Sequence, residues 1–419
     1  MECGVDSKKL IPPKHPVNLA IFFEQEMSIG GNYQQAFNNV LVVKNISSEI
    51  VRVVYFTTIK KNVEVLTSYG IDAEFLPISG LNRMWLSIRR TVMSKIGWKF
   101  IPFIEKKNYL ERTLGCHNID LVYFTSQSAL PVFLEHINYI YTLFDLCHRD
   151  YPEFPEVNFR GVFEKRDLLF NAVLPKAIAV FVDSDLGKAN AVRYYGLNES
   201  RVFVMPFSCS VHSNIDEKEY IDRFINVRLK YDLKVDYVFY PAQFWSHKNH
   251  IYLLNGIKEL ELVYGIVIGV IFSGGDQGNI CHVKKYSKDL GLLNRVRFAG
   301  FVPDYEMPYL YRQSIALVMP TYFGPTNLPP LEAFRLGVPV LYSDLPGLRD
   351  QVGKAALLMN LQDPRSMADH LACLMKDGNL RQSLIDKGTH RLDGLSESNP
   401  EKTLTIVLKK FQHCRDCWI

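Results

Sequence analysis

Short apolar runs alternate with longer segments of helical periodicity along most of the chain. The runs are rich in Val, Ile, Phe and Tyr, as buried strands are, and the segments between them repeat apolar residues every three or four positions. This alternation predicts an α/β protein with parallel sheets. We expect strands near 17–23, 51–57, 119–124, 137–143, 179–183 and 201–205, and again near 236–242, 266–273, 295–302, 315–320, 338–342 and 355–359.

The strand pattern starts twice, which indicates two domains. The segment between the two series, 207–235, is polar and carries charged residues, so we place the junction directly after Pro206. A chain of 419 residues is also long for a single core. The expected domains are 1–206 and 207–398, and 399–419 is expected to be a helix and tail that packs back across the junction.

Composition narrows the class of protein. Hydrophobic residues make up 47% and charged residues 22%, which is the balance of a globular protein and not of a disordered one. The longest nearly apolar run, 263–272, has ten residues, whereas a bilayer crossing needs roughly 20. No signal peptide is evident, so we expect a cytoplasmic protein with eight reduced cysteines. The CxxC from Cys414 to Cys417 has no second pair, and we expect no metal site.

The net charge of +4 is unevenly distributed. Residues 81–112 carry eight basic and two acidic side chains, and the apolar residues within 81–96 recur at helical spacing. Such a basic amphipathic segment suits the interface of an anionic bilayer. The alternative is that its apolar stripe packs on the N-terminal sheet while the charges are solvated. No other basic surface is evident, so we expect no nucleic-acid partner.

Ligands of parallel sheets bind at the carboxyl ends of the strands, so the loops there carry the candidate chemistry. Gly30 and Gly31 follow the first strand and open a helix, where the backbone can approach an anion closely; a plain tight turn is the alternative. Lys248 follows the strand near 236–242 and is expected in the first turn of a helix, where a cation is unfavourable. A bound phosphate would explain that placement, and a solvated lysine is the alternative.

The loop at 320–333 follows another apolar strand. Asn327 is expected to cap the next helix, and two prolines after it remove two amides, which leaves those of Thr326, Asn327 and Leu328 as donors to a ligand. Glu332 lies one turn further, where its carboxylate can accept hydrogen bonds from a ribose diol. A carboxylate that only stabilises the helix is the alternative.

Several segments together resemble glycosyltransferase family 4, the retaining enzymes of the GT-B fold. They are 241–249, 300–307, 323–333 and 337–340 in the second half of the chain, and Gly30-Gly31 and 144–153 in the first. The resemblance implies two Rossmann-like domains whose parallel sheets face a central cleft. The N-terminal domain would bind the acceptor and the C-terminal domain the nucleotide sugar.

By resemblance the protein moves a hexosyl or deoxyhexosyl group from a nucleoside-diphosphate sugar to a glycan, lipid-linked or protein acceptor, with retention and without metal or cofactor. Lys248 would bind the pyrophosphate and Glu332 the ribose. Asp145 and His148 are the candidates for contacting the sugar or the acceptor. The remaining donor contacts would be Gly30, Gly31, Gln243, the backbone at Phe301 and Val302, and the amides of Thr326, Asn327 and Leu328.

Three positions depart from the family pattern. Gly324 stands where a glutamate touches the donor sugar, Gln243 where an arginine is common, and Phe144 where a histidine often precedes Asp145. These departures keep two alternatives open: a non-catalytic relative that binds a nucleotide sugar, and a GT-B-fold sugar-nucleotide epimerase. If the segment 81–112 binds lipid, the enzyme would work as a peripheral protein at the inner face of the membrane.

Overall fold

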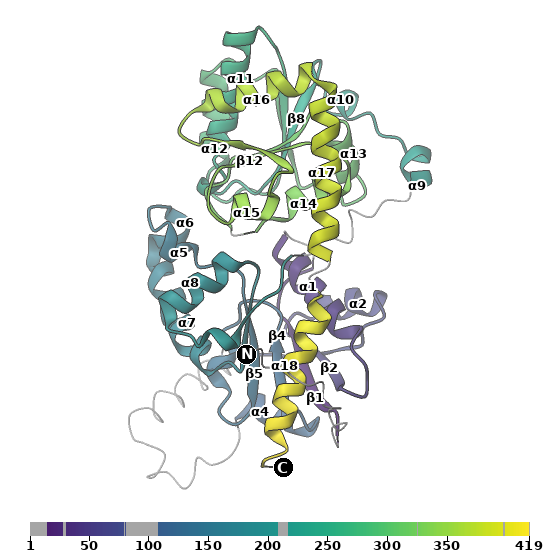
Figure 1. Ribbon diagram of the computed structural model, residues 1–419, viewed down its shortest axis with the longest axis vertical. Coiled ribbons are helices and arrows are strands. Elements are labelled where there is room, and N and C mark those ends of the chain that lie inside the picture. The colour runs from purple at the N-terminus through teal and green to yellow at the C-terminus, as the bar shows by residue number, and fades with distance from the viewer. Residues whose placement is uncertain are drawn as a thin grey trace, which may run out of the picture.

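The computed structural model describes residues 15–27, 31–78, 80, 108–207, 217–324, 326–396 and 399–418. They form two α/β domains stacked end to end, with the N-terminal domain below the C-terminal one in Figure 1. Both sheets are parallel, as the alternating sequence pattern predicts.

The N-terminal sheet has the strand order β3-β2-β1-β4-β5-β6-β7. Successive side chains of β1 point to opposite faces, and they enter two separate hydrophobic clusters, one on each side of the sheet. The sheet is therefore covered on both faces, which explains why its strands are continuous apolar runs. The strands are β1 (Val17–Phe23), β2 (Val51–Thr57), β3 (Ala73–Phe75), β4 (Leu121–Phe124), β5 (Asn138–Leu143), β6 (Ala179–Val182) and β7 (Val202–Val204).

The C-terminal sheet has the order β10-β9-β8-β11-β12-β13 and lies within one large hydrophobic cluster. Its strands are β8 (Tyr237–Pro241), β9 (Gly269–Ser273), β10 (Val296–Gly300), β11 (Leu317–Met319), β12 (Val340–Ser343) and β13 (Ala356–Met359). All the strands of both sheets match the predicted runs except β3. That edge strand was missed because two of its three side chains are exposed, so it makes no apolar run.

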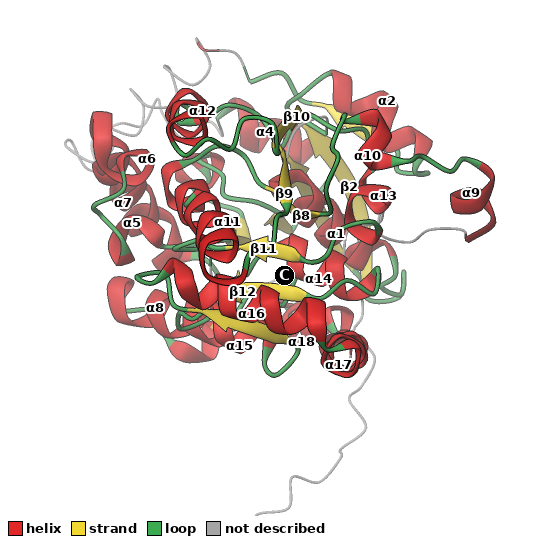
Figure 2. Cartoon of the chain, turned by 90° about the horizontal axis from the view of Figure 1, so that it is seen from above, coloured by secondary structure: helices red, strands yellow, loops and turns green. Residues whose placement is uncertain are grey.

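Helices connect the strands and cover the sheets, as Figure 2 shows from above for the C-terminal domain. Those of the N-terminal domain are α1 (Gly31–Lys44), α2 (Lys61–Ser68), α4 (Tyr109–Cys116), α5 (Cys147–Asp150), α6 (Pro155–Asn158), α7 (Val162–Val173) and α8 (Asp185–Tyr195). Those that follow are α9 (Glu217–Asp222), α10 (Val227–Lys230), α11 (His250–Tyr264), α12 (Ile280–Asp289), α13 (Met307–Arg312), α14 (Leu328–Arg335), α15 (Leu348–Val352), α16 (Pro364–Lys376), α17 (Gly378–Ser396) and α18 (Pro400–Arg415).

The last helix, α18, returns to the N-terminal domain and runs along it to the C-terminus (Figure 1). Its buried side chains, Leu404, Val407, Leu408 and Phe411, belong to the N-terminal hydrophobic cluster that contains β1. Their three- and four-residue spacing places them on one face of the helix. The prediction of a C-terminal helix that packs back across the junction is confirmed.

Candidate functional site

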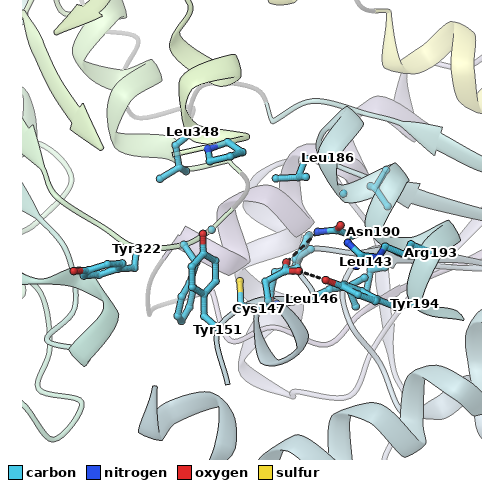
Figure 3. A pocket seen from close by; sticks show the side chains of 18 residues that line it. Leu143, Leu146, Cys147, Tyr151, Leu186, Asn190, Arg193, Tyr194, Tyr322 and Leu348 are labelled. Atoms are coloured by element: carbon cyan, nitrogen blue, oxygen red, sulfur yellow. Dashed lines mark hydrogen bonds between the residues drawn. The ribbon is translucent and has the colours of Figure 1, made fainter. Parts of the chain in front are cut away.

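One cavity of about 290 Å³ lies between the two domains. The loops after β5 and β6 line it from the N-terminal side, and those after β11 and β12 line it from the other (Figure 3). The two sheets thus direct the carboxyl ends of their strands at a shared space, as ligand sites of parallel sheets do. The charged and polar lining side chains are Asp145, Asp150, Asn190, Arg193, Tyr194, Tyr151 and Tyr322, and apolar side chains such as Phe144, Leu186 and Leu348 complete the wall.

Lys248 ends a short 3-10 turn, Ser246–Lys248, that leads from β8 to α11. The prediction placed it inside the first turn of the helix; the structure corrects this by one residue. Asn249 adopts a left-handed conformation (φ 52°) and caps α11 by accepting from the backbone N–H of Tyr252. The kink at Asn249 separates the lysine from the helix and turns its side chain toward the junction. We call residues 243–249 the lysine loop.

The Lys248 ammonium makes no ion pair with the described residues, and the carboxylates of Asp145 and Glu156 act on it only from a longer distance. Its Nζ donates to Asn327 Oδ1 at 3.1 Å, and no carboxylate oxygen of the described residues lies within 4.0 Å of it. Although the residue as a whole is only partly buried, desolvation lowers the pKa of Lys248 to about 8. A desolvated ammonium without a counterion is the local chemistry of a site for phosphate.

Asn327 precedes α14 in an extended conformation, as expected for a cap, but its side chain does not cap the helix. It accepts from Lys248 and donates to the Gly324 carbonyl (3.1 Å) and the Tyr342 hydroxyl (2.6 Å). Its backbone N–H donates to Gln351 Oε1 at 3.1 Å. The prediction that this amide serves a ligand is therefore wrong for this arrangement, because an internal acceptor occupies it. We call the described residues 321–324 and 326–328 the asparagine loop.

Gly324 departs from the family pattern for a local reason. Its φ of 101° is one that side-chain-bearing residues rarely adopt, and a Cβ there would lie 3.1 Å from Asn327 Oδ1. A glutamate at this position would strain the loop and press on the amide that holds Lys248. A glycine at this position therefore leaves room for the contact between Asn327 and Lys248.

The residues predicted to hold the nucleoside lie on the C-terminal domain. Glu332 sits in α14, where its Oε2 accepts from the Tyr311 hydroxyl at 2.7 Å. Phe301 follows β10 with 70% of its surface exposed, whereas Val302 beside it is buried in the core. An exposed aromatic face beside a buried backbone is compatible with stacking on a base.

Asp145 is the second residue after β5 and lines the cavity. Arg166 Nη2 donates to its Oδ1 at 2.5 Å, and the Cys147 N–H donates to the same oxygen at 3.1 Å. Burial alone would raise the pKa of Asp145, but Arg166 outweighs it and holds the pKa below its ordinary value. The side chain is therefore a fixed carboxylate aimed at the space between the domains.

His148 does not reach the cavity. Its side chain is completely buried between the rings of Phe163 and Phe170, and its Nε2 lies 3.3 Å from the Tyr195 hydroxyl. Burial lowers its pKa to about 4, so the imidazole is neutral. The interpretation of His148 as a residue that contacts the sugar does not fit this position; it packs behind Asp145 instead.

The remaining predicted positions are at the margin of the site or outside it. Gln243 begins the lysine loop, where its Oε1 accepts from the Trp245 indole at 3.0 Å. Gly31 is the first residue of α1, whereas Gly30 lies outside the described residues. Most of the basic segment 81–112 also lies outside them, with only 108–112 described.

The sequence analysis missed two contacts across the junction. The Thr326 hydroxyl donates to Asp183 Oδ2 at 2.5 Å, and burial raises the pKa of Asp183 to about 7. Glu156 lies against His247 of the lysine loop. Asp183 stands at the end of a predicted strand, so the rule for strand ends could have found it. Glu156 could not be found, because only the packing of the domains gives it a partner.

Among the described residues, Glu111, Glu135 and His136 are spaced as metal ligands could be. Glu111 already accepts from the backbone N–H groups of the other two at 2.7 and 2.6 Å. This carboxylate therefore serves to fix the loop before β5. The cluster is also far from the loops that line the cavity, none of which contribute to it.

The comparisons with known proteins agree with this geometry. Residues 223–391 match the family of glycosyl transferases group 1. The O-antigen chain mannosyltransferase B of Escherichia coli is 25% identical over 289 residues, 67% of this chain and 72% of that protein. The D-inositol 3-phosphate glycosyltransferase of Frankia alni is 31% identical, but over only 38% of its length. The chain is a glycosyltransferase with the GT-B fold.

Solved structures show the same architecture over nearly the whole enzyme. A glycosyltransferase from Rickettsia africae superposes with a TM-score of 0.67 at 14% identity, over 94% of this chain and 98% of that one. HepE from Anabaena, in complex with UDP-glucose, gives 0.64 at 15% identity, over 95% and 99%.

Proposed function

We propose that the enzyme transfers a hexosyl or deoxyhexosyl group from a nucleoside-diphosphate sugar to a hydroxyl of a glycan or lipid-linked acceptor, with retention, as family 4 enzymes do. The observation that carries this proposal is the Lys248 ammonium, which is desolvated, makes no ion pair with the described residues and lies against Asn327 in the loop that leads from β11 to α14. The similarity to an O-antigen chain mannosyltransferase supports a hexose donor and a glycan acceptor.

The donor would lie along the C-terminal side of the cleft. Its base would stack near Phe301 and Val302, and its ribose would bind Glu332. The pyrophosphate would bind Lys248, together with the amides of Thr326 and Leu328 at the start of α14. The positive end of that helix favours the same charge. The remaining contacts to the donor would come from residues at the edge of the site, namely Gly30, Gly31 and Gln243.

The transferred sugar would then enter the cavity beside Asp145. As the nucleoside diphosphate leaves, negative charge develops on its phosphates and positive charge on the sugar ring. Lys248 and the α14 N-terminus can stabilise the first, and the Asp145 carboxylate can stabilise the second. These groups supply the charge stabilisation without a metal. The acceptor hydroxyl would approach through the part of the cavity lined by Asp150, Asn190 and Tyr194, which are already hydrogen-bonded to one another (Figure 3).

The test is release of nucleoside diphosphate from a panel of UDP- and GDP-linked hexoses, with and without EDTA and with glycan and lipid-linked acceptors. A thermal-shift screen of the same panel precedes it, since a ligand at 100 times its Kd adds about 2.7 kcal/mol to stability. We expect one donor to shift the melting temperature and to turn over in EDTA. Binding without turnover on any acceptor would favour the non-catalytic alternative, and conversion of the donor without an acceptor would favour the epimerase.

Glu332→Gln tests the ribose contact. The amide cannot accept from both hydroxyls of the diol, so the Kd for the nucleoside diphosphate and for the intact donor should rise by the same factor, about tenfold. Isothermal titration with both ligands measures this. Arg335→Gln, an exposed position on the same helix, is the control. Unchanged affinity for both ligands would remove Glu332 from the donor site.

We also propose that the enzyme works as a peripheral protein at the cytoplasmic face of a membrane, through the basic segment 81–112. None of the helices in the described part of the chain is long and apolar enough to cross a bilayer. The enzyme should co-sediment with vesicles that contain anionic lipid and dissociate as salt rises. Replacing Arg89, Arg90, Lys95 and Lys99 with Glu should abolish this while activity on a short water-soluble acceptor persists. No binding at low salt would remove the membrane role.

A further inference from the structure

The segment that follows Asp145 reaches across the junction to the donor side. It contains α5 and α6, which lie at the edge of the N-terminal domain nearest the other domain (Figure 1). Tyr151 stacks on Phe323 of the asparagine loop, with ring centroids 5.7 Å apart, and Phe154 packs its edge against the same ring at 5.4 Å. These rings form a small apolar cluster that includes side chains of both domains.

Within this cluster, Glu156 makes two hydrogen bonds to one residue of the lysine loop. Its Oε1 accepts from the His247 backbone N–H at 2.8 Å and lies 2.6 Å from His247 Nδ1. Both side chains are almost buried, with 7% of the Glu156 side chain and 10% of the His247 side chain exposed. Burial lowers the pKa of His247 to about 4, so a neutral imidazole donates from Nδ1 to the carboxylate. The burial of this carboxylate is offset by two donors, both from the residue before Lys248.

His247 also connects the lysine loop to the asparagine loop. Its carbonyl accepts from the Tyr322 N–H at 2.9 Å, and its ring stacks on Phe323 with centroids 3.8 Å apart. The next residue, Lys248, makes the contact with Asn327. Glu156 is not within ion-pair distance of Lys248, so its charge acts on the ammonium only from a longer distance. It holds the loop while leaving the charge available.

We propose that Glu156 is a positioning residue of the N-terminal domain: through His247 it fixes the lysine loop and the asparagine loop in the arrangement that presents Lys248 to the phosphates of the donor. This inference rests on the proposed role of Lys248. Donor affinity in the C-terminal domain thereby depends on a carboxylate supplied by the domain proposed to bind the acceptor. Glu156 touches neither the donor nor the reacting atoms.

The experiment compares Glu156→Ala, Glu156→Gln and Lys248→Met by titration with the nucleoside diphosphate of the preferred donor and with the matching nucleoside. Glu156→Ala should raise the Kd of the nucleoside diphosphate about tenfold or more, because the loop is no longer held for binding. Affinity for the nucleoside, which does not reach Lys248, should stay within twofold of wild type. Glu156→Gln keeps an acceptor oxygen in the same place and should lose less. Glu153→Ala, an exposed carboxylate on the same segment, is the control and should bind both ligands normally.

The variants also separate this inference from the proposed function. If Lys248→Met loses the nucleoside diphosphate while both Glu156 variants bind it like wild type, the positioning role is wrong and the donor site stands. If Lys248→Met itself binds normally, the proposed donor site is wrong. Equal loss of nucleoside and nucleoside diphosphate in the Glu156 variants would show general damage to the domain and would also overturn the positioning role. Should Glu156→Ala not fold, the Glu156→Gln titration decides by the same criteria.

Discussion

Lys248→Met is expected to lower turnover about a hundredfold or more and to abolish the thermal shift given by the donor, while the fold is retained. The methionine keeps the length and apolar stem of the side chain and removes only the charge. Loss of one preorganised group that stabilises a leaving phosphate raises the barrier by about 3–4 kcal/mol, which corresponds to this loss in rate. Steady-state release of nucleoside diphosphate measures it. Turnover within threefold of wild type would exclude Lys248 from the site.

The same variant should be more stable than wild type at neutral pH when no donor is bound. The folded pKa of Lys248 is about 8 and its ordinary value is 10.5, so the unfolded chain binds more protons at this position between these two pH values. Wild-type stability at this site therefore rises with pH across that window, and below it the full penalty of the charged form is present. Lys248→Met has no such penalty and should be stabilised by on the order of 1 kcal/mol at pH 7.

Melting temperatures of wild type and Lys248→Met, measured from pH 7 to 10.5, test the direction of this pH dependence. The advantage of Lys248→Met should shrink toward the alkaline end, where the wild-type amine is neutral in both states. Added donor should reverse the order at pH 7, because a bound phosphate favours the charged lysine. A constant difference at every pH would mean that the ammonium is not desolvated.

Asp145→Asn is expected to lower kcat about a hundred- to a thousandfold and to change the Kd of the donor less than threefold. The asparagine can still accept from Arg166 and from the Cys147 N–H, so the local hydrogen bonds remain. What is lost is a negative charge beside the sugar ring, and that charge matters most when the ring is positive in the transition state. Turnover at saturating donor, together with titration of the donor, separates the two effects.

A matched control for Asp145 is available in the same region. Asp167 pairs with Arg149 at 2.6 Å but does not line the cavity. Asp167→Asn therefore removes a similar ion pair without removing a charge from the site, and it should lower stability and not kcat. If both variants lose kcat equally, Asp145 acts through the structure of this region and not on the sugar. Because the pKa of Asp145 is held low, activity should not decline through its titration between pH 7 and 5.

The architecture could be predicted because both faces of each sheet are buried. Each central strand therefore appears in the sequence as a continuous run of apolar residues. Two series of such runs gave two parallel sheets, and the rule that ligands meet strand ends pointed to the loops that carry Gly31, Lys248 and Asn327. Asp145 and His148 came only from the resemblance of 144–153 to the family. The resemblance did not place His148, which lies five positions after the end of β5, on the correct side of its turn. That residue lies in a single helical turn, and the sequence does not encode which side of α5 turns inward.

The sequence by itself determined the secondary structure, the two-domain division of the sheets and the loops that would meet at the cleft, because these follow from local periodicity and from glycine, proline and cap positions. Only the tertiary structure decided which donors find which acceptors. Thr326 meets Asp183 from 143 residues away, and His247 meets Glu156 from 91. The Asn327 amide is taken by Gln351, and Lys248 is left without a carboxylate among the described residues. Such pairings depend on the packing of one domain against the other, which no pattern along the chain specifies.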